Sequence, residues 1–177
     1  MAVYELCVSE LSDYIEKLRC GDKVFLTGDI YTARDAAHSI ISKMIVKEEE
    51  LPFVIDGSVI YYAGPTPVNA NGHIGSYGPT TSARMDNFTP LLLDNGVIAT
   101  IGKGNRSDNV IDAIKRNKSV YFCACGGLGA LISETIIKSE EIAFSELGCE
   151  SIKRLTVNKM PLITAIDSSG KSIFDRS

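Results

Sequence analysis

The sequence has no long apolar run and no excess of positive charge, and each absence excludes a class of protein. None of its hydrophobic runs approaches the ~20 residues that a membrane-spanning helix requires. Its 18 basic residues are outnumbered by 22 acidic ones, which gives a net charge of −4. Proteins that bind mainly nucleic acid need a basic surface for the phosphate backbone. We therefore expect neither nucleic acid nor a membrane among the partners.

The five cysteines lack a disulfide or metal-ligand pattern. No two of them are spaced as CxxC, and the first residues, MAVYELCVSE, are acidic where a signal peptide is basic. An odd cysteine count without an export signal argues against a disulfide scaffold, so we expect a cytoplasmic protein. Alternation along SVYFCACGG would put Cys123 and Cys125 on one face of a strand. We favour buried core thiols there over metal ligands.

The common catalytic motifs are missing as well. The sequence has no HExxH, no Ser-His-Asp order and no spaced set of carboxylates and histidines. The GKG at 102–104 lacks the frame of a Walker A loop, and the GGLG at 126–129 lacks the context of a dinucleotide fingerprint. The only histidines are His38, which we interpret as a packing or supporting residue in a helix, and His73, which we expect to be exposed in a loop.

What is present indicates one domain, residues 1–177, with a substantial core, because 45% of the residues are hydrophobic. Strand-like runs alternate with helical patterns through the middle of the chain, which predicts parallel strands in an α/β sheet. The ends are richer in β structure. The predicted strands are 23–28, 97–102, 119–124, 141–145, 153–157 and 162–167, and the stretch 53–64 contains further strand runs with a turn at Asp56 and Gly57. The predicted helices are 9–19, 32–50, 82–95, one from 107, and one after 126–129 to about 138; residues 64–80 are a predicted loop.

Three cations stand where an apolar run gives way to a helical pattern. They are Arg34 in TARDAAH, Arg84 in GPTTSARMD and Lys103 in IGKGNRS. A cation in the first turn of a helix opposes the helix dipole, so three at similar junctions suggest a shared task. Helix N-termini bind anions through unpaired N–H groups. We therefore predict a site for a small carboxylate or phosphate.

Each of these motifs also has a purely structural interpretation. GPTTSARMD could be a threonine N-cap followed by a surface arginine, and residues 101–109 could be a plain turn between a strand and a helix. A basic pocket with threonines can bind an anion but is incomplete as an enzyme. Either the chain is a binding domain, or another chain supplies the remaining groups.

The stretches TARDAAH, YYAGP, GPTTSARMD, GKGNRS and SELG, in that order, resemble a known family. They are similar to the β subunit of two-subunit class I iron–sulfur fumarate hydratases, which is also the C-terminal domain of single-chain members. Tartrate dehydratase β subunits are close relatives. The resemblance covers residues 20–175. It implies a swivelling β/β/α-type domain with a partly parallel central sheet, and a partner α subunit whose three cysteines hold a [4Fe–4S] cluster, in an α2β2 assembly.

The resemblance also implies roles for individual residues. Matched position by position, Arg34, Arg84 and Lys103 correspond to residues that clamp the substrate carboxylates. Thr80 corresponds to the catalytic base of the family. A threonine is a poor base at its ordinary pKa, so we expect Lys103 to take part in catalysis by lowering the cost of the Thr80 alkoxide.

The neighbouring motif residues have less defined roles. Thr81 and Arg106 are expected to bind substrate, while Asp86 and Asn105 lie within the motifs without an assigned role. The Asn-Arg pair at 105–106 favours fumarate and malate, because tartrate dehydratase β subunits lack it. A mesaconate-type hydratase and a non-enzymatic dicarboxylate-binding module stay open as alternatives. No metal ligand is expected in this chain.

Overall fold

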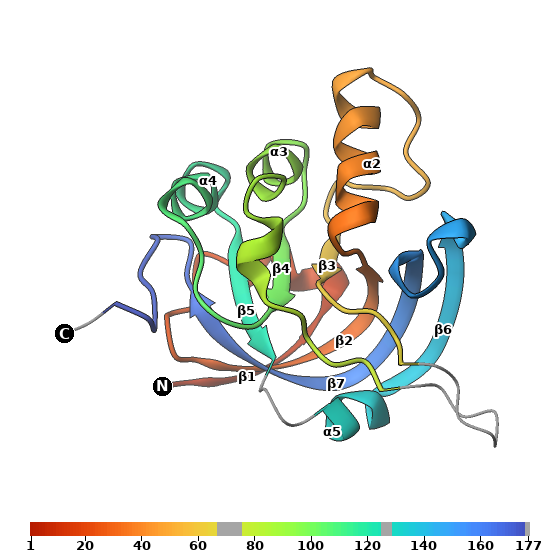
Figure 1. Ribbon diagram of the computed structural model, residues 1–177. Coiled ribbons are helices and arrows are strands. Elements are labelled where there is room, and N and C mark those ends of the chain that lie inside the picture. Colours follow the sequence, from red (N-terminus) through yellow and green to blue (C-terminus); the bar gives the residue numbers. More distant parts are fainter. Residues whose placement is uncertain (67–75, 125–128, 176–177) are drawn as a thin grey trace.

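The computed structural model (Figure 1) describes residues 1–66, 76–124 and 129–175. Its strands are β1 (Val3–Cys7), β2 (Lys23–Thr32), β3 (Val59–Tyr61), β4 (Ala99–Gly102), β5 (Val120–Ala124), β6 (Ile136–Ala143) and β7 (Ile152–Ile166). Its α-helices are α1 (Leu11–Tyr14), α2 (Asp35–Val46), α3 (Thr89–Asp94), α4 (Asp108–Asn117) and α5 (Gly129–Glu134). The 3-10 helices are η1 (Val8–Glu10), η2 (Ser82–Met85) and η3 (Ser145–Glu150).

Within these residues the strands form one seven-stranded sheet in the order β1-β2-β3-β4-β5-β7-β6. Strands β1 to β5 run parallel to one another, whereas β7 is antiparallel to β2, β5 and β6. Because β7 pairs with both β2 and β5, the strands β2, β3, β4, β5 and β7 close into a ring (Figure 1). The predicted α/β class with a partly parallel sheet is confirmed.

Two apolar clusters stabilise the ring, one on each face of its strands. Alternation along β3 and the residue after it separates them: Val59 and Tyr61 belong to one cluster, and Ile60 and Tyr62 to the other. The second cluster includes the buried apolar residues of α2, α3 and α4, helices that lie together on one side of the sheet in Figure 1. The helices therefore cover the outside of β3, β4 and β5, and the first cluster fills the inside.

The region predicted as one helix over 82–95 is two shorter pieces, η2 and α3. Pro90 lies in the first turn of α3, where its missing N–H is not needed. In a continuous helix its ring would clash with the carbonyl of Asp86. The break therefore follows from the proline.

The C-terminal third differs most from the prediction. The helix expected to about residue 138 ends at Glu134, and β6 begins at Ile136 in a β-branched stretch, TII. The two strands expected over 153–157 and 162–167 are one strand, β7, with a register shift where it faces Leu26 and Gly28 of β2.

The strand runs predicted within 53–64 are also shorter than expected. Only Val59–Tyr61 is a strand, although the expected turn at Asp56 and Gly57 is present. Part of the predicted loop 64–80 lies outside the described residues. In the described part of the chain, no helix combines the length and the apolar character that crossing a bilayer requires.

Candidate active site

The parallel strands β2, β3 and β4 end at one edge of the sheet, and the predicted site residues follow these ends. Arg34 comes just after β2, and Lys103 directly follows β4. The N–H of Thr80 donates to the carbonyl of Tyr62, the residue after β3, at 2.7 Å. The structure therefore gathers these residues at the carboxyl edge of adjacent strands, where ligands of α/β folds bind.

Arg34 is held at the start of α2 by a carboxylate. Its guanidinium lies 3.3 Å from Glu150 Oε1, and Glu150 Oε2 accepts the N–H of Ala36 at 3.0 Å. Among the described residues, the buried Nε of Arg34 has no hydrogen-bond partner. Space beside it is limited, because a Cβ at Gly64 would lie 2.6 Å from the carbonyl of Cys149 and 3.3 Å from Arg34 Cδ. Arg34 thus keeps a donor that no group in the described part of the chain uses.

Arg84 reaches the same helix from η2. Its Nε donates to Asp35 Oδ1 at 3.0 Å, and its second nitrogen lies 2.8 Å from Asp35 Oδ2. Only the Nε contact is a hydrogen bond; the contact with Oδ2 is an ion pair, and among the described residues that oxygen has no hydrogen-bond partner. Asp35 is the first residue of α2 and adjoins Arg34. The ion pair therefore brings the second arginine to the start of α2, with half of its side chain exposed.

Lys103 is fixed by its backbone, while its side chain is exposed. Thr81 and Lys103 form an isolated parallel bridge, the N–H of Ser82 donates to the Lys103 carbonyl at 3.0 Å, and the N–H of Lys103 donates to Ser82 Oγ at 3.1 Å. Within the described residues the ammonium group has no salt-bridge partner. Lys103 is therefore a positioned cation whose charge the described part of the protein leaves uncompensated.

Arg106 lies elsewhere, beneath this edge. Its side chain is fully buried, and its Nε donates to Asp86 Oδ1 at 2.7 Å. The other guanidinium nitrogens donate to Thr89 Oγ1 at 2.7 Å and to Thr100 Oγ1 at 3.3 Å. Burial lowers the pKa of Arg106, but Tyr62 and Asp86 raise it by more, so the group keeps its charge. Arg106 is thus not among the cations that the structure brings to the surface of the edge.

The sequence model of the Fumarase C-terminus family matches residues 3–177. The chain belongs to this family. It is 40% identical over 167 residues to a Methanocaldococcus jannaschii protein with the provisional name L(+)-tartrate dehydratase subunit beta, covering 91% of this chain and 86% of that one. It is 36% identical over 171 residues to the anaerobic class I fumarate hydratase of Escherichia coli, and 34% identical over 172 residues to fumarate hydratase 2 of Leishmania major. Each match covers 96% of this chain but 30% of the fumarate hydratase. The predicted resemblance is confirmed.

The resemblance implied that a partner α subunit holds the iron–sulfur cluster, and we therefore asked whether this chain could hold it. In residues 1–66, 76–124 and 129–175, no three or more His, Cys, Asp or Glu side chains gather to hold a metal ion. The described cysteines lie on separate segments: Cys7 ends β1, Cys20 is in the turn before β2, Cys123 is on β5 and Cys149 is on η3. The described residues do not fit a cluster, and we derive no step through one.

Two residues that contact the candidate site, Ser82 and Tyr121, were not identified from the sequence. Ser82 lies inside GPTTSARMD but was not singled out, although it binds both backbone groups of Lys103. The hydroxyl of Tyr121, on β5, lies 2.9 Å from Ser82 Oγ and 2.8 Å from the Gly104 carbonyl. Nothing in the spacing of the sequence marks Tyr121, because its contacts depend on the order of strands in the sheet.

The predicted packing role of His38 agrees with its position. The ring is buried against Tyr62 and Phe88, and its Nδ1–H donates to the Arg34 carbonyl, 2.9 Å away. Burial lowers the pKa of His38 to about 4, so the ring is neutral at pH 7. His73, Cys125 and most of the GGLG motif lie outside the described residues.

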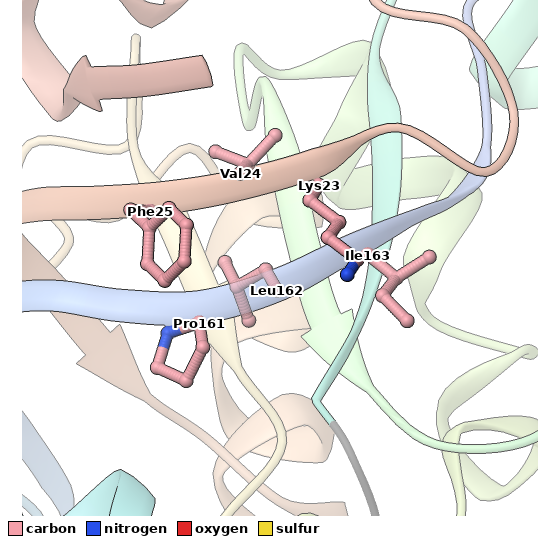
Figure 2. Close-up of a pocket in the computed structure, with 6 residues that line it drawn as sticks. All are labelled: Lys23, Val24, Phe25, Pro161, Leu162 and Ile163. Carbon is pink, nitrogen blue, oxygen red and sulfur yellow. The ribbon is translucent and has the colours of Figure 1, made fainter. Parts of the chain in front are cut away.

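A cavity of about 210 Å³ lies away from the candidate site. Figure 2 shows it between the start of β2 and the end of β7, lined by Lys23–Phe25 and Pro161–Ile163. Its lining is mostly apolar, and it lies at the opposite end of β2 from Arg34. It is therefore separate from the cationic edge.

Proposed function

We propose that this chain is the β component of an iron–sulfur-dependent hydro-lyase that interconverts fumarate and (S)-malate by reversible hydration. The observation that carries the proposal is the gathering of Arg34, Arg84, Lys103 and Thr80 at the carboxyl edge of β2, β3 and β4. Family membership and two relatives named as fumarate hydratases support it.

A dicarboxylate fits the charges of this edge. Within the described residues, the Nε–H of Arg34 has no acceptor and the ammonium group of Lys103 has no salt-bridge partner. A carboxylate can satisfy both groups. Arg84, anchored by Asp35, presents a half-exposed guanidinium. Cations at both ends of a small dicarboxylate would fix which carbon faces the base. We propose that the exposed Thr81 adds a hydroxyl contact to the substrate.

In our proposal Thr80 is the general base. In the direction of malate dehydration it takes the proton from the carbon next to one carboxylate, and the electron pair left behind spreads into that carboxylate as an aci-carboxylate. The pair then forms the double bond of fumarate while hydroxide leaves from the neighbouring carbon. The clamping cations stabilise the aci-carboxylate more than the ground state, because it carries more negative charge. Lys103 also lowers the cost of the Thr80 alkoxide.

We further propose that a partner α chain holds a [4Fe–4S] cluster, in an α2β2 assembly, and that this chain is inactive alone. The cluster would supply Lewis-acid chemistry; the residues described above bind, orient and deprotonate the substrate. The relative named subunit beta supports a partner chain, as does the finding that this chain spans only 30% of the matched fumarate hydratases. The odd cysteine count supports a cytoplasmic location.

Tartrate dehydration is the second candidate. The 40% identity to the relative named as a tartrate dehydratase subunit favours it. Against it stands the Asn-Arg pair, in which Asn105 Oδ1 accepts the N–H of Arg106 at 2.8 Å. Both reactions remove water next to a carboxylate, so the same residues would serve either one.

The test is anaerobic reconstitution of the chain with its candidate α partner and cluster, assayed on malate, fumarate, tartrate and mesaconate. We expect turnover only with the partner, highest on malate or fumarate, and its loss in Thr80→Ala. Highest turnover on tartrate or mesaconate would keep the mechanism and change the substrate. A chain that binds dicarboxylates but shows no turnover with any partner would instead be a binding module.

A further inference from the structure

Arg106 is the centre of a buried network directly beneath the candidate site. The guanidinium lies 5.2 Å from the ring centroid of Tyr62 and 4.9 Å from that of Tyr121. Its edge is bonded to Asp86 and Thr89. The two nearby rings and the acceptors along the edge leave the charge little freedom to move. An arginine held this way fixes the elements around it.

The partner carboxylate of Arg106 joins two segments of the site. Asp86 directly follows η2, which carries Arg84, and its Oδ1 accepts the Nε–H of Arg106 at 2.7 Å. Its Oδ2 accepts the backbone N–H of Ser107 at 2.7 Å. One carboxylate therefore connects the segment 80–86 to the segment 103–107.

Tyr121 makes a second connection between the same segments. Its hydroxyl lies 2.8 Å from the Gly104 carbonyl and 2.9 Å from Ser82 Oγ. A carbonyl can only accept, so the phenol hydrogen goes to Gly104, and Ser82 can donate its own hydrogen to the phenol oxygen. Ser82 Oγ then accepts the N–H of Lys103 at 3.1 Å. This chain of bonds runs from the buried ring to the backbone of the predicted catalytic lysine.

We propose that Arg106 and Tyr121 are positioning residues that hold Lys103 in place relative to Thr80 and Arg84; the inference rests on the proposed function. Arg106 acts through Asp86, and Tyr121 acts through Ser82 and Gly104. Neither side chain contacts substrate in this account, although Arg106 was expected from its motif to do so. A displacement of about 1 Å at a reacting group can lower the rate about 100-fold, so such support matters.

The test compares Tyr121→Phe with Tyr61→Phe in the reconstituted complex. Phenylalanine at 121 keeps the ring over Arg106 and removes only the hydroxyl. Tyr61 is the matched control, since its equally buried hydroxyl donates to the Tyr77 carbonyl at 2.6 Å, outside the two segments. We expect Tyr121→Phe to lower kcat about tenfold or more while KM changes less than about threefold. Tyr61→Phe should keep kcat within about twofold.

Arg106→Lys provides a second variant, because lysine keeps the charge but not the planar fork. We expect the same fall in kcat, with Arg116→Lys on the surface of α4 as its control. If Arg106→Lys fails to assemble, Tyr121→Phe alone still tests the inference.

An assembled Tyr121→Phe enzyme with unchanged kcat, or with a fall in kcat equal to that of Tyr61→Phe, would overturn the inference and leave the proposed function standing. A wild-type complex inactive on all four substrates would overturn the proposed function, and the inference with it.

Discussion

Ser82 and Lys103 are joined by two hydrogen bonds: the N–H of Ser82 donates to the Lys103 carbonyl at 3.0 Å, and the N–H of Lys103 donates to Ser82 Oγ at 3.1 Å. The two residues lie on different segments, Ser82 at the start of η2 and Lys103 directly after β4. Their pairing fixes how these two segments lie against each other, and the close approach of Ser82 requires a small residue at position 102, which is Gly102.

Gly102→Ala should therefore destabilise the protein. A Cβ at Gly102 would overlap Ser82 Oγ and lie 3.0 Å from Tyr62 Cδ2. Because both neighbours are buried, we expect a loss of about 1–3 kcal/mol in the free energy of unfolding, measured by urea denaturation. Gly78→Ala is the control, since no heavy atom lies within 4 Å of its added Cβ. Equal stabilities of the two variants would contradict the packing described here.

Arg106→Met should be among the most destabilising single substitutions in the chain. It removes the partner of the Asp86 carboxylate, whose side chain is only 11% exposed. Breaking a buried ion pair by removing one partner lowers the free energy of unfolding by about 3–5 kcal/mol. Arg116→Met removes an arginine from an exposed pair with Asp94, where solvent screens the charges and a much smaller loss is expected. Comparable losses in the two variants would show that Arg106 is not buried as described.

Lys103→Met should remove turnover with little effect on stability. Its side chain is exposed, and its backbone bonds do not depend on the ammonium group. We expect kcat in the reconstituted complex to fall about 100- to 1000-fold, as when one group that stabilises a developing anion is lost. Lys47→Met, an exposed lysine after α2, should leave kcat unchanged. Retention of more than half of the wild-type kcat would exclude Lys103 from the chemistry.

His38 should make the protein acid-sensitive. Burial lowers its pKa from 6.5 to about 4, so between these values the unfolded chain binds a proton that the folded chain does not. The stabilising contribution is therefore present above pH 6.5 and is lost as the pH falls toward 4, by about 3 kcal/mol. His38→Asn keeps a donor for the Arg34 carbonyl but cannot titrate. Urea denaturation between pH 7 and pH 4 should show a steeper loss in the wild type; parallel curves for the two proteins would refute this account.

The sequence was sufficient to predict that three cations lie near the strand ends, but not the groups that support them; their roles toward substrate stay predictions. Arg34, Arg84 and Lys103 follow the ends of apolar runs, and in a parallel sheet the ends of strands meet at one edge. Burial of Arg106 could not be predicted this way, because it depends on Tyr62 and Tyr121, which β3 and β5 bring together from distant parts of the chain.

The errors in the fold have local and non-local causes. The break in the helix predicted over 82–95 has a local cause, Pro90, which is visible in the sequence. The start of β6 at Ile136 cannot be predicted from the local sequence, because LISETIIK is compatible with a helix or a strand. Pairing with β7 selects the strand. The length of β7 likewise depends on its partners β2, β5 and β6.

Strand β7 gives the protein a late and non-local final folding step. It closes the ring by pairing Ile163 with Lys23 and Leu162 with Ala124, so β2 keeps an unpaired edge until residues far along the chain are available. Contacts between residues so distant in sequence slow folding. During synthesis the parallel strands emerge before the strand that joins their two ends. The ring whose edge carries the cations is therefore complete only when β7 has paired with both β2 and β5.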